Sequence, residues 1–147
     1  MVINIRSRKL LSLFNEVWRL IPNQRDKALL SKRIMLVTDN IDFIPIGTKP
    51  KWGAVISIRF KKSLAVLYLS PRRLLSQPAD FVRHIIASLL AHVVLGHLDE
   101  IDDEEKHEEF EREADRQAKH WLSPQGHSST NQQRGDNEAD SEFIRYV

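Results

Sequence analysis

The feature that most constrains the fold is a predominantly apolar stretch between Pro78 and Leu98. Its apolar side chains recur at helical spacing in two rows: Phe81, Ile85, Leu89 and Val93, and Val82, Ile86 and Leu90. A helix that is apolar over most of its surface is buried on most sides. Proline suits the first turn, where one backbone N–H has no helical partner. We therefore expect one long central helix with the rest of the domain packed around it.

A line of three polar residues, His84, Ser88 and His92, runs along this helix at intervals of four. In the motif His-Glu-x-x-His, histidines at this spacing lie on one face and hold one zinc ion, and the glutamate activates a metal-bound water. Here His92 has the place of the second histidine. Ser88 stands in the place of the first, and Leu89 in the place of the glutamate. Leucine has no proton to give or accept, so the pattern keeps the helix and loses the reacting groups.

Two further segments match the same pattern. His92 is followed by Val-Val-Leu-Gly-His97, an ending typical of such helices, and Glu111-Arg-Glu-Ala-Asp115 begins 19 residues after His92. With the order of short helix, hairpin, motif helix and second helix, residues 34–122 resemble a minimal zincin-like metallopeptidase domain of the gluzincin type. Short bacterial and phage proteases share this arrangement.

The resemblance implies an α+β fold, with a small, mostly antiparallel sheet, a central active-site-type helix and a second, ligand-type helix. It also implies that His92 matches the second metal ligand, Glu111 the third, and Asp115 a carboxylate that orients a ligand histidine. A catalytic zinc site needs three protein ligands and a water, and a general base contributes about 10²–10⁴ in rate. With Ser88 and Leu89 in the degenerate positions, we expect an inactive pseudo-protease without a cofactor.

The histidines leave two alternatives for the site. His107 and Glu111 are four residues apart on the predicted helix Glu108–Leu122, so His92, His107 and Glu111 together would make a rearranged zinc site and an active peptidase. Otherwise His92 has a structural role, hydrogen-bonded to Glu111 or Asp115. His84 lies about 12 Å from His92 along the axis, too far to share one ion.

The remaining pattern predicts one domain over residues 1–122, with N-terminal helices in 1–33 and the core in 34–122. Residues 123–147 are expected to be a disordered tail with an apolar tip, which either docks on a surface or frays. A peptide partner would add as a strand to a groove edged by the hairpin strand Leu64–Ser70. The predicted elements outside the long helix are helices at Ser7–Ile21 and Arg25–Lys32, and strands at Ile34–Thr38, Trp52–Phe60 and Leu64–Ser70.

Charge is divided unevenly along the chain. Residues 1–98 hold 16 Lys or Arg against 5 Asp or Glu, whereas residues 99–147 hold 6 against 15. This asymmetry leaves open a nucleic acid or acidic partner that binds through Arg72, Arg73, Lys61, Lys62 and their neighbours. The alternative is that the acidic segment screens the basic half within the molecule. The chain has no cysteine and no apolar run of about 18 residues, so we expect a cytoplasmic protein with a protein or peptide partner and no membrane span.

Overall fold

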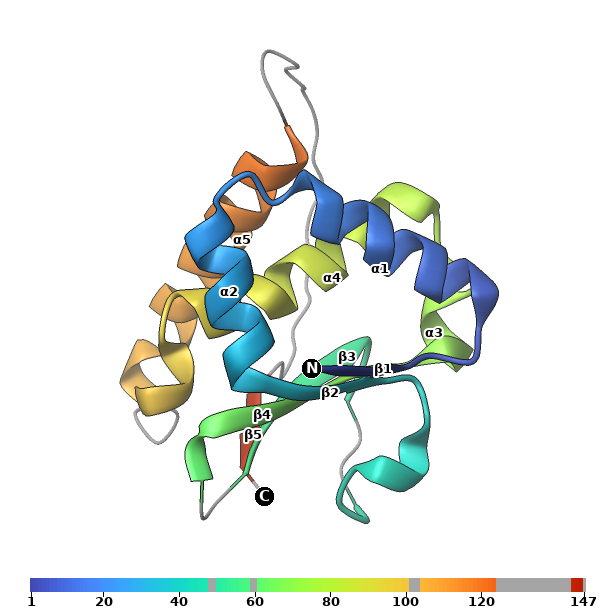
Figure 1. The fold of residues 1–147 in the computed structure, drawn as a ribbon. Helices are drawn as coiled ribbons and strands as arrows, with labels where there is room; N and C mark the ends of the chain where they lie inside the picture. The colour runs from blue at the N-terminus through green and yellow to red at the C-terminus, as the bar shows by residue number, and fades with distance from the viewer. Residues whose placement is uncertain (48–49, 59–60, 101–103, 124–143, 147) are drawn as a thin grey trace.

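The computed structural model describes residues 1–47, 50–58, 61–100, 104–123 and 144–146. Helices and strands alternate irregularly along the chain, so the predicted α+β class is confirmed (Figure 1). The strands are β1 (Val2–Asn4), β2 (Ile34–Thr38), β3 (Gly53–Ile58), β4 (Lys61–Leu69) and β5 (Ile144–Tyr146). The α-helices are α1 (Arg8–Leu20), α2 (Gln24–Arg33), α3 (Pro71–Leu74), α4 (Ala79–Val94) and α5 (His107–Leu122). Short 3-10 turns lie at Ile41–Phe43, His97–Glu100 and Glu104–Lys106.

The five strands form one mixed sheet in the order β1-β2-β4-β3-β5. The predicted hairpin is confirmed, because β3 and β4 pair in antiparallel fashion, with Gly53 opposite Leu69. The other three pairings are parallel: β1 with β2, β2 with β4, and β3 with β5. The expectation of a mostly antiparallel sheet was therefore wrong. Two of the parallel pairings involve β1 and β5, three-residue strands that are too short to show a periodic pattern, and the third joins the predicted strands β2 and β4, whose relative direction a local pattern does not determine.

Strand β4 lies inside the sheet, between β2 and β3. The predicted groove edged by Leu64–Ser70 is therefore wrong, since both edges of that strand already carry neighbours. Within the hairpin, the outward edge belongs to β3, and β5 pairs with it. The rest of the predicted tail, residues 124–143 and 147, lies outside the described residues.

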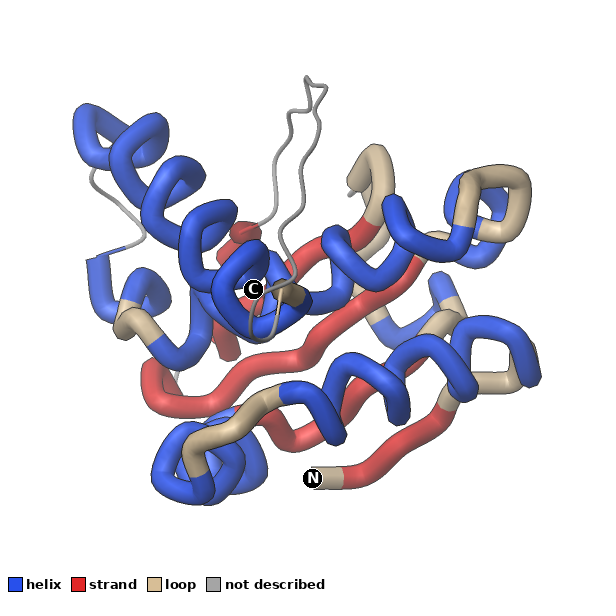
Figure 2. The backbone as a smooth tube through the Cα atoms, turned by 90° about the horizontal axis from the view of Figure 1, so that it is seen from above, coloured by secondary structure: helices blue, strands red, loops and turns tan. Residues whose placement is uncertain are grey.

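The helices α1, α2, α4 and α5 cover one face of the sheet, as the views from the side and from above show (Figures 1 and 2). Helix α4 is at the centre of this layer and packs against α1, α2, α5 and β3. Its residues from Ile85 to Val93 are all buried, so the predicted central helix is confirmed. One main hydrophobic core joins residues of the N-terminal helices, the sheet, α4 and α5.

Local capping explains where the first helices begin. Ser7 caps α1 by accepting a hydrogen bond from the N–H of Leu10, and Asn23 caps α2 by accepting from the N–H of Arg25. The Asp39 carboxylate accepts from the N–H groups of Arg6 and Ser7, both at 3.0 Å. This carboxylate ties the start of α1 to the end of β2.

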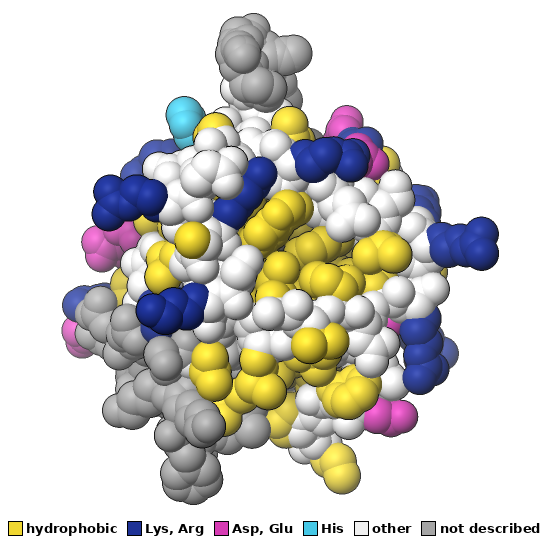
Figure 3. Space-filling view, in the orientation of Figure 1, with side chains coloured by type: hydrophobic (Ala, Val, Ile, Leu, Met, Phe, Trp, Pro, Cys, Tyr) yellow, Lys and Arg dark blue, Asp and Glu magenta, His cyan; other side chains and the backbone are white. Residues whose placement is uncertain are grey.

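The second face of the sheet carries a smaller buried cluster of Ile44, Ala54, Ile56 and Tyr68. Hydrophobic side chains also reach the surface: in the view of Figure 3 they gather in a central hollow, with Lys and Arg side chains around it. Large exposed hydrophobic residues on β1 and β2 are Val2, Ile3 and Met35. Among the residues that the structure describes, no helix combines the length and apolarity needed to cross a bilayer.

Candidate functional site

The candidate site lies where the end of α4 meets α5. Helix α4 ends at Val94, and Gly96 follows with a φ of 78°. Such a positive φ is common only for glycine, and it reverses the chain after a helix. The reversal returns His97 to the helix, and its Nδ1 lies 2.8 Å from Nδ1 of His92. The two rings meet edge to face, with centroids 5.0 Å apart.

The second ring nitrogen of His97 connects this pair to α5. His97 Nε2 lies 2.8 Å from Oε1 of Glu113, and the His97 ring stacks on Phe110 with centroids 4.1 Å apart. Phe110 and Glu113 are three residues apart, so they lie on one face of α5. The chain of His92, His97 and Glu113 therefore connects the central helix α4 to α5.

Burial keeps His92 neutral. Its side chain is 1% exposed, and burial lowers its pKa to about 3, with smaller contributions from the charges of His97 and His107. The Glu113 carboxylate accepts hydrogen bonds, so His97 donates from Nε2. The contact between the two Nδ1 atoms needs one N–H, and His92 donates it when Nδ1 of His97 carries a lone pair. The lone pair of His92 then lies on Nε2, 3.8 Å from Oε2 of Glu111.

This arrangement can be compared with the requirements of a metal site. A ligand histidine commonly donates its second ring N–H to a neighbouring group, which fixes the tautomer. His97 is the neighbouring group for Nδ1 of His92, and Glu111 faces Nε2 of His92. The third ligand is lacking, because Ser88 stands one turn before His92 and is 6% exposed. Two donors do not fit a catalytic zinc ion, which takes three protein ligands.

Leu89, which stands in the place of the glutamate of the His-Glu-x-x-His pattern, is packed in the core. Leu89 is fully buried, and its Cδ1 lies 3.0 Å from the place where a Cβ on Gly53 would be. The side chain therefore lies against the first residue of β3. A glutamate in this place would leave water for an apolar contact, which is costly for a charged group.

The rearranged zinc site of His92, His107 and Glu111 finds no support among the described residues. In the described part of the chain, no three His, Asp or Glu side chains come together in a group that could hold a metal ion. His107 is exposed at the first residue of α5, while His92 lies in the core. Helical spacing brings His107 and Glu111 to one face of α5, and the charge of His107 contributes to the lowered pKa of His92.

Asp115 is not beside His92 but beside His84. The Oδ1 of Asp115 lies 2.7 Å from Nε2 of His84, and its Oδ2 lies 3.1 Å from Nζ of Lys119. The hydrogen bond to His84 is the main cause that lowers the pKa of Asp115, and Lys119 adds to it. The expectation that Asp115 orients a ligand histidine was thus wrong, since His97 and Glu113 orient His92. The sequence carried one signal for this, the Gly96-His97 pair after the helix.

Hydrogen bonds therefore connect α4 and α5 at two places, one through His84 and Asp115 and one through His92, His97 and Glu113. A cavity of about 590 Å³ is lined by Glu113 of this network together with Leu95, Arg116, Gln117 and His120. No family model matches the sequence, and no curated protein or solved structure matches the chain. What these groups can do chemically is to hold two helices together with polar contacts.

Proposed function

We propose that this protein is a catalytically inactive relative of the zincin-like metallopeptidases, and that it binds an extended peptide segment of a protein partner. Support for the ancestry comes from His92 and Glu111, which face each other at 3.8 Å. Support for the lost activity comes from Ser88 and Leu89, which replace the ligand and the base. An active peptidase built on His92, His107 and Glu111 has no comparable support, since these side chains do not form one group.

The observation that carries the binding role is the strand on the outer edge of β3. Ile144, Arg145 and Tyr146 pair in parallel with Val55, Ile56 and Ser57. An edge strand presents unpaired N–H and C=O groups, and an added strand satisfies them. Strand β3 is otherwise the last strand on this side of the sheet. We infer that the edge of β3 accepts a peptide strand and that β5 fills it within the free protein.

The test disrupts the pairing of β5 with the edge of β3 in the full chain. Neighbouring residues of a strand point their N–H groups in opposite directions, so one N–H of Ile144 and Arg145 faces β3. The double variant I144P/R145P removes both N–H groups and therefore removes that donor. A synthetic peptide of residues 142–147 is then added, and amide exchange is followed along Val55–Ser57 at the N–H groups that point away from β4. We expect the variant to bind the peptide and to regain protection of these amides.

Wild-type protein should bind the same peptide at least about tenfold more weakly, because a tethered strand competes at an effective concentration in the millimolar range. A peptide with the same two prolines serves as the matched control and should not protect the amides. If the folded variant leaves the amides of β3 exchanging at the same rate with and without peptide, the binding proposal is refuted.

Residence in the cytoplasm is also part of this proposal. A chain without cysteine folds without disulfides, which suits a reducing compartment. The partner proposed here is a protein that offers an extended segment.

A further inference from the structure

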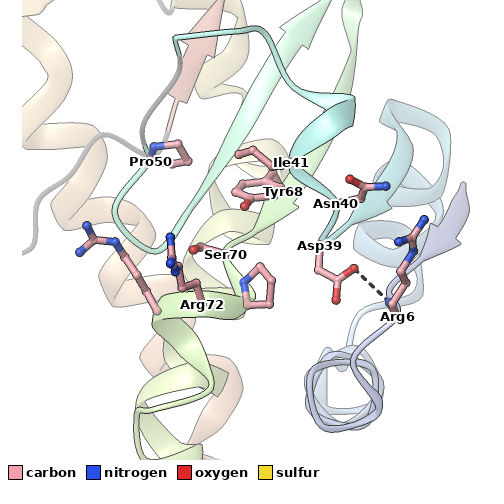
Figure 4. Close-up of a pocket in the computed structure, with 10 residues that line it drawn as sticks. Arg6, Asp39, Asn40, Ile41, Pro50, Tyr68, Ser70 and Arg72 are labelled. Atoms are coloured by element: carbon pink, nitrogen blue, oxygen red, sulfur yellow. Dashed lines mark hydrogen bonds between the residues drawn. The ribbon is translucent and has the colours of Figure 1, made fainter.

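A second cavity lies at the edge of the sheet where the carboxyl ends of β1, β2 and β4 meet. These three strands are parallel, and each is followed by residues that line the cavity. Its volume is about 600 Å³ (Figure 4). The lining residues are Arg6, Asp39, Asn40, Ile41, Pro50, Tyr68, Ser70, Pro71, Arg72 and Arg73.

None of these ten lining residues belongs to the histidine network between α4 and α5, so the cavity is a separate feature of the molecule.

The cavity is rich in positive charge. Three of its lining side chains are arginines, and Asp39 is its one acidic lining residue. Both carboxylate oxygens of Asp39 already accept backbone N–H groups, those of Arg6 and Ser7. Across the described residues, no ion pair is formed by Arg6, Arg72 or Arg73. Guanidinium groups that are exposed and without an acidic partner are available to an anion.

The walls of the cavity differ in character. In Figure 4, Arg72 and Ser70 lie on one side, Asp39 and Arg6 on the other, and Tyr68 and Ile41 between them. Ile41 is 52% exposed and offers an apolar surface, while Tyr68 and Ser70 are buried. Burial is the main cause that raises the pKa of the Tyr68 phenol, so this group keeps its proton and can donate a hydrogen bond.

Arginine matches phosphate well, because its planar guanidinium donates two parallel hydrogen bonds to two oxygens. Small-molecule sites commonly measure about 300–1,000 Å³ and combine apolar walls with a few polar groups. We propose that this cavity binds a small phosphate ester of mononucleotide size, with the phosphate on Arg72 and Arg73 and the organic part against Ile41 and Pro50. This inference is independent of the peptide-binding proposal, because it uses other residues and another edge of the sheet.

The test is calorimetric titration of the full chain with adenosine monophosphate, inorganic phosphate and adenosine. The variant R72A/R73A removes two of the three arginines. The matched control R19A/R25A removes the same charge from exposed positions outside the cavity. A hydrogen bond to a charged group contributes about 1.5–3 kcal/mol, which corresponds to a change in affinity of about tenfold or more.

We expect the nucleotide to bind at least about tenfold more tightly than either phosphate or adenosine. R72A/R73A should weaken nucleotide binding by at least about tenfold, and R19A/R25A by less than about twofold. Equal affinity for nucleotide and adenosine would overturn the role of the arginines, and equal affinity for nucleotide and phosphate would overturn the role of the apolar wall. Absence of nucleotide binding, or equal losses in the two variants, would overturn the proposal as a whole.

Discussion

Lowering the pH from 7 to 5 should destabilise the fold through His92. The folded protein holds this imidazole neutral, because its side chain is 1% exposed and its pKa is lowered to about 3. In the unfolded chain the same group titrates near its ordinary value of 6.5. Between pH 6.5 and 3 the unfolded state therefore binds more protons than the folded state, and stability rises with pH in this window. The contribution is fully present above pH 6.5 and is lost as the pH falls.

The size of the effect follows from the two pKa values. Each pH unit within the window changes the free energy of unfolding by at most about 1.36 kcal/mol for one group. From pH 6.5 to pH 5 the loss is about 2 kcal/mol. This is a large part of the roughly 5–15 kcal/mol that stabilises a typical domain.

Urea denaturation at pH 7 and pH 5 measures the effect, with the variant H92N as the control. Asparagine does not titrate, and its amide can donate to His97 from a position near that of Nδ1. Because other titrating groups act in both proteins, the difference between wild type and variant isolates His92. We expect wild type to lose about 2 kcal/mol more than H92N over this pH range. Equal losses in the two proteins would refute the account of His92 as a buried neutral group.

Two further substitutions test the site and its packing. S88H should complete a zinc site with His92 and Glu111, and zinc at 100 times its Kd should raise the free energy of unfolding by about 2.7 kcal/mol. Zinc uptake is measured by equilibrium dialysis, with S88A as the control that should bind no zinc. A folded S88H that takes up no zinc would contradict the inferred ancestry. G53A should lower the free energy of unfolding by about 1–3 kcal/mol, measured by thermal unfolding, because its Cβ would lie 2.5 Å from the Tyr68 carbonyl oxygen. An unchanged Tm would contradict the close contact of β3 and β4 at this position.

Much of the helical layer could be predicted from local patterns. The helix expected at Ser7–Ile21 is observed at Arg8–Leu20, and the strand expected at Ile34–Thr38 is observed with the same bounds. Helix α4 ends at Val94, four residues before the predicted end at Leu98. The positive φ of Gly96 accounts for the difference, since a glycine after an apolar run can lie inside a helix or terminate it.

The candidate site was only partly predictable, because its contacts depend on how α5 lies against α4. The resemblance to the zincin-like domain implied Glu111 and Asp115 as residues near the long helix, and both do contact histidines of that helix. It could not assign which carboxylate meets which histidine. The bond between His97 and Glu113 needs both the reversed chain after α4 and the position of α5.

The sequence by itself determined the buried central helix and the identities of Ser88 and Leu89, which decide the chemistry that this helix can offer. These depend on periodicity and residue type, and both are local properties of the chain. Only the tertiary structure decided that β4 lies inside the sheet, that β5 pairs with β3, and that His97 orients His92. Such partners are selected by packing and hydrogen bonding between residues far apart in the chain, and a local pattern does not encode that selection.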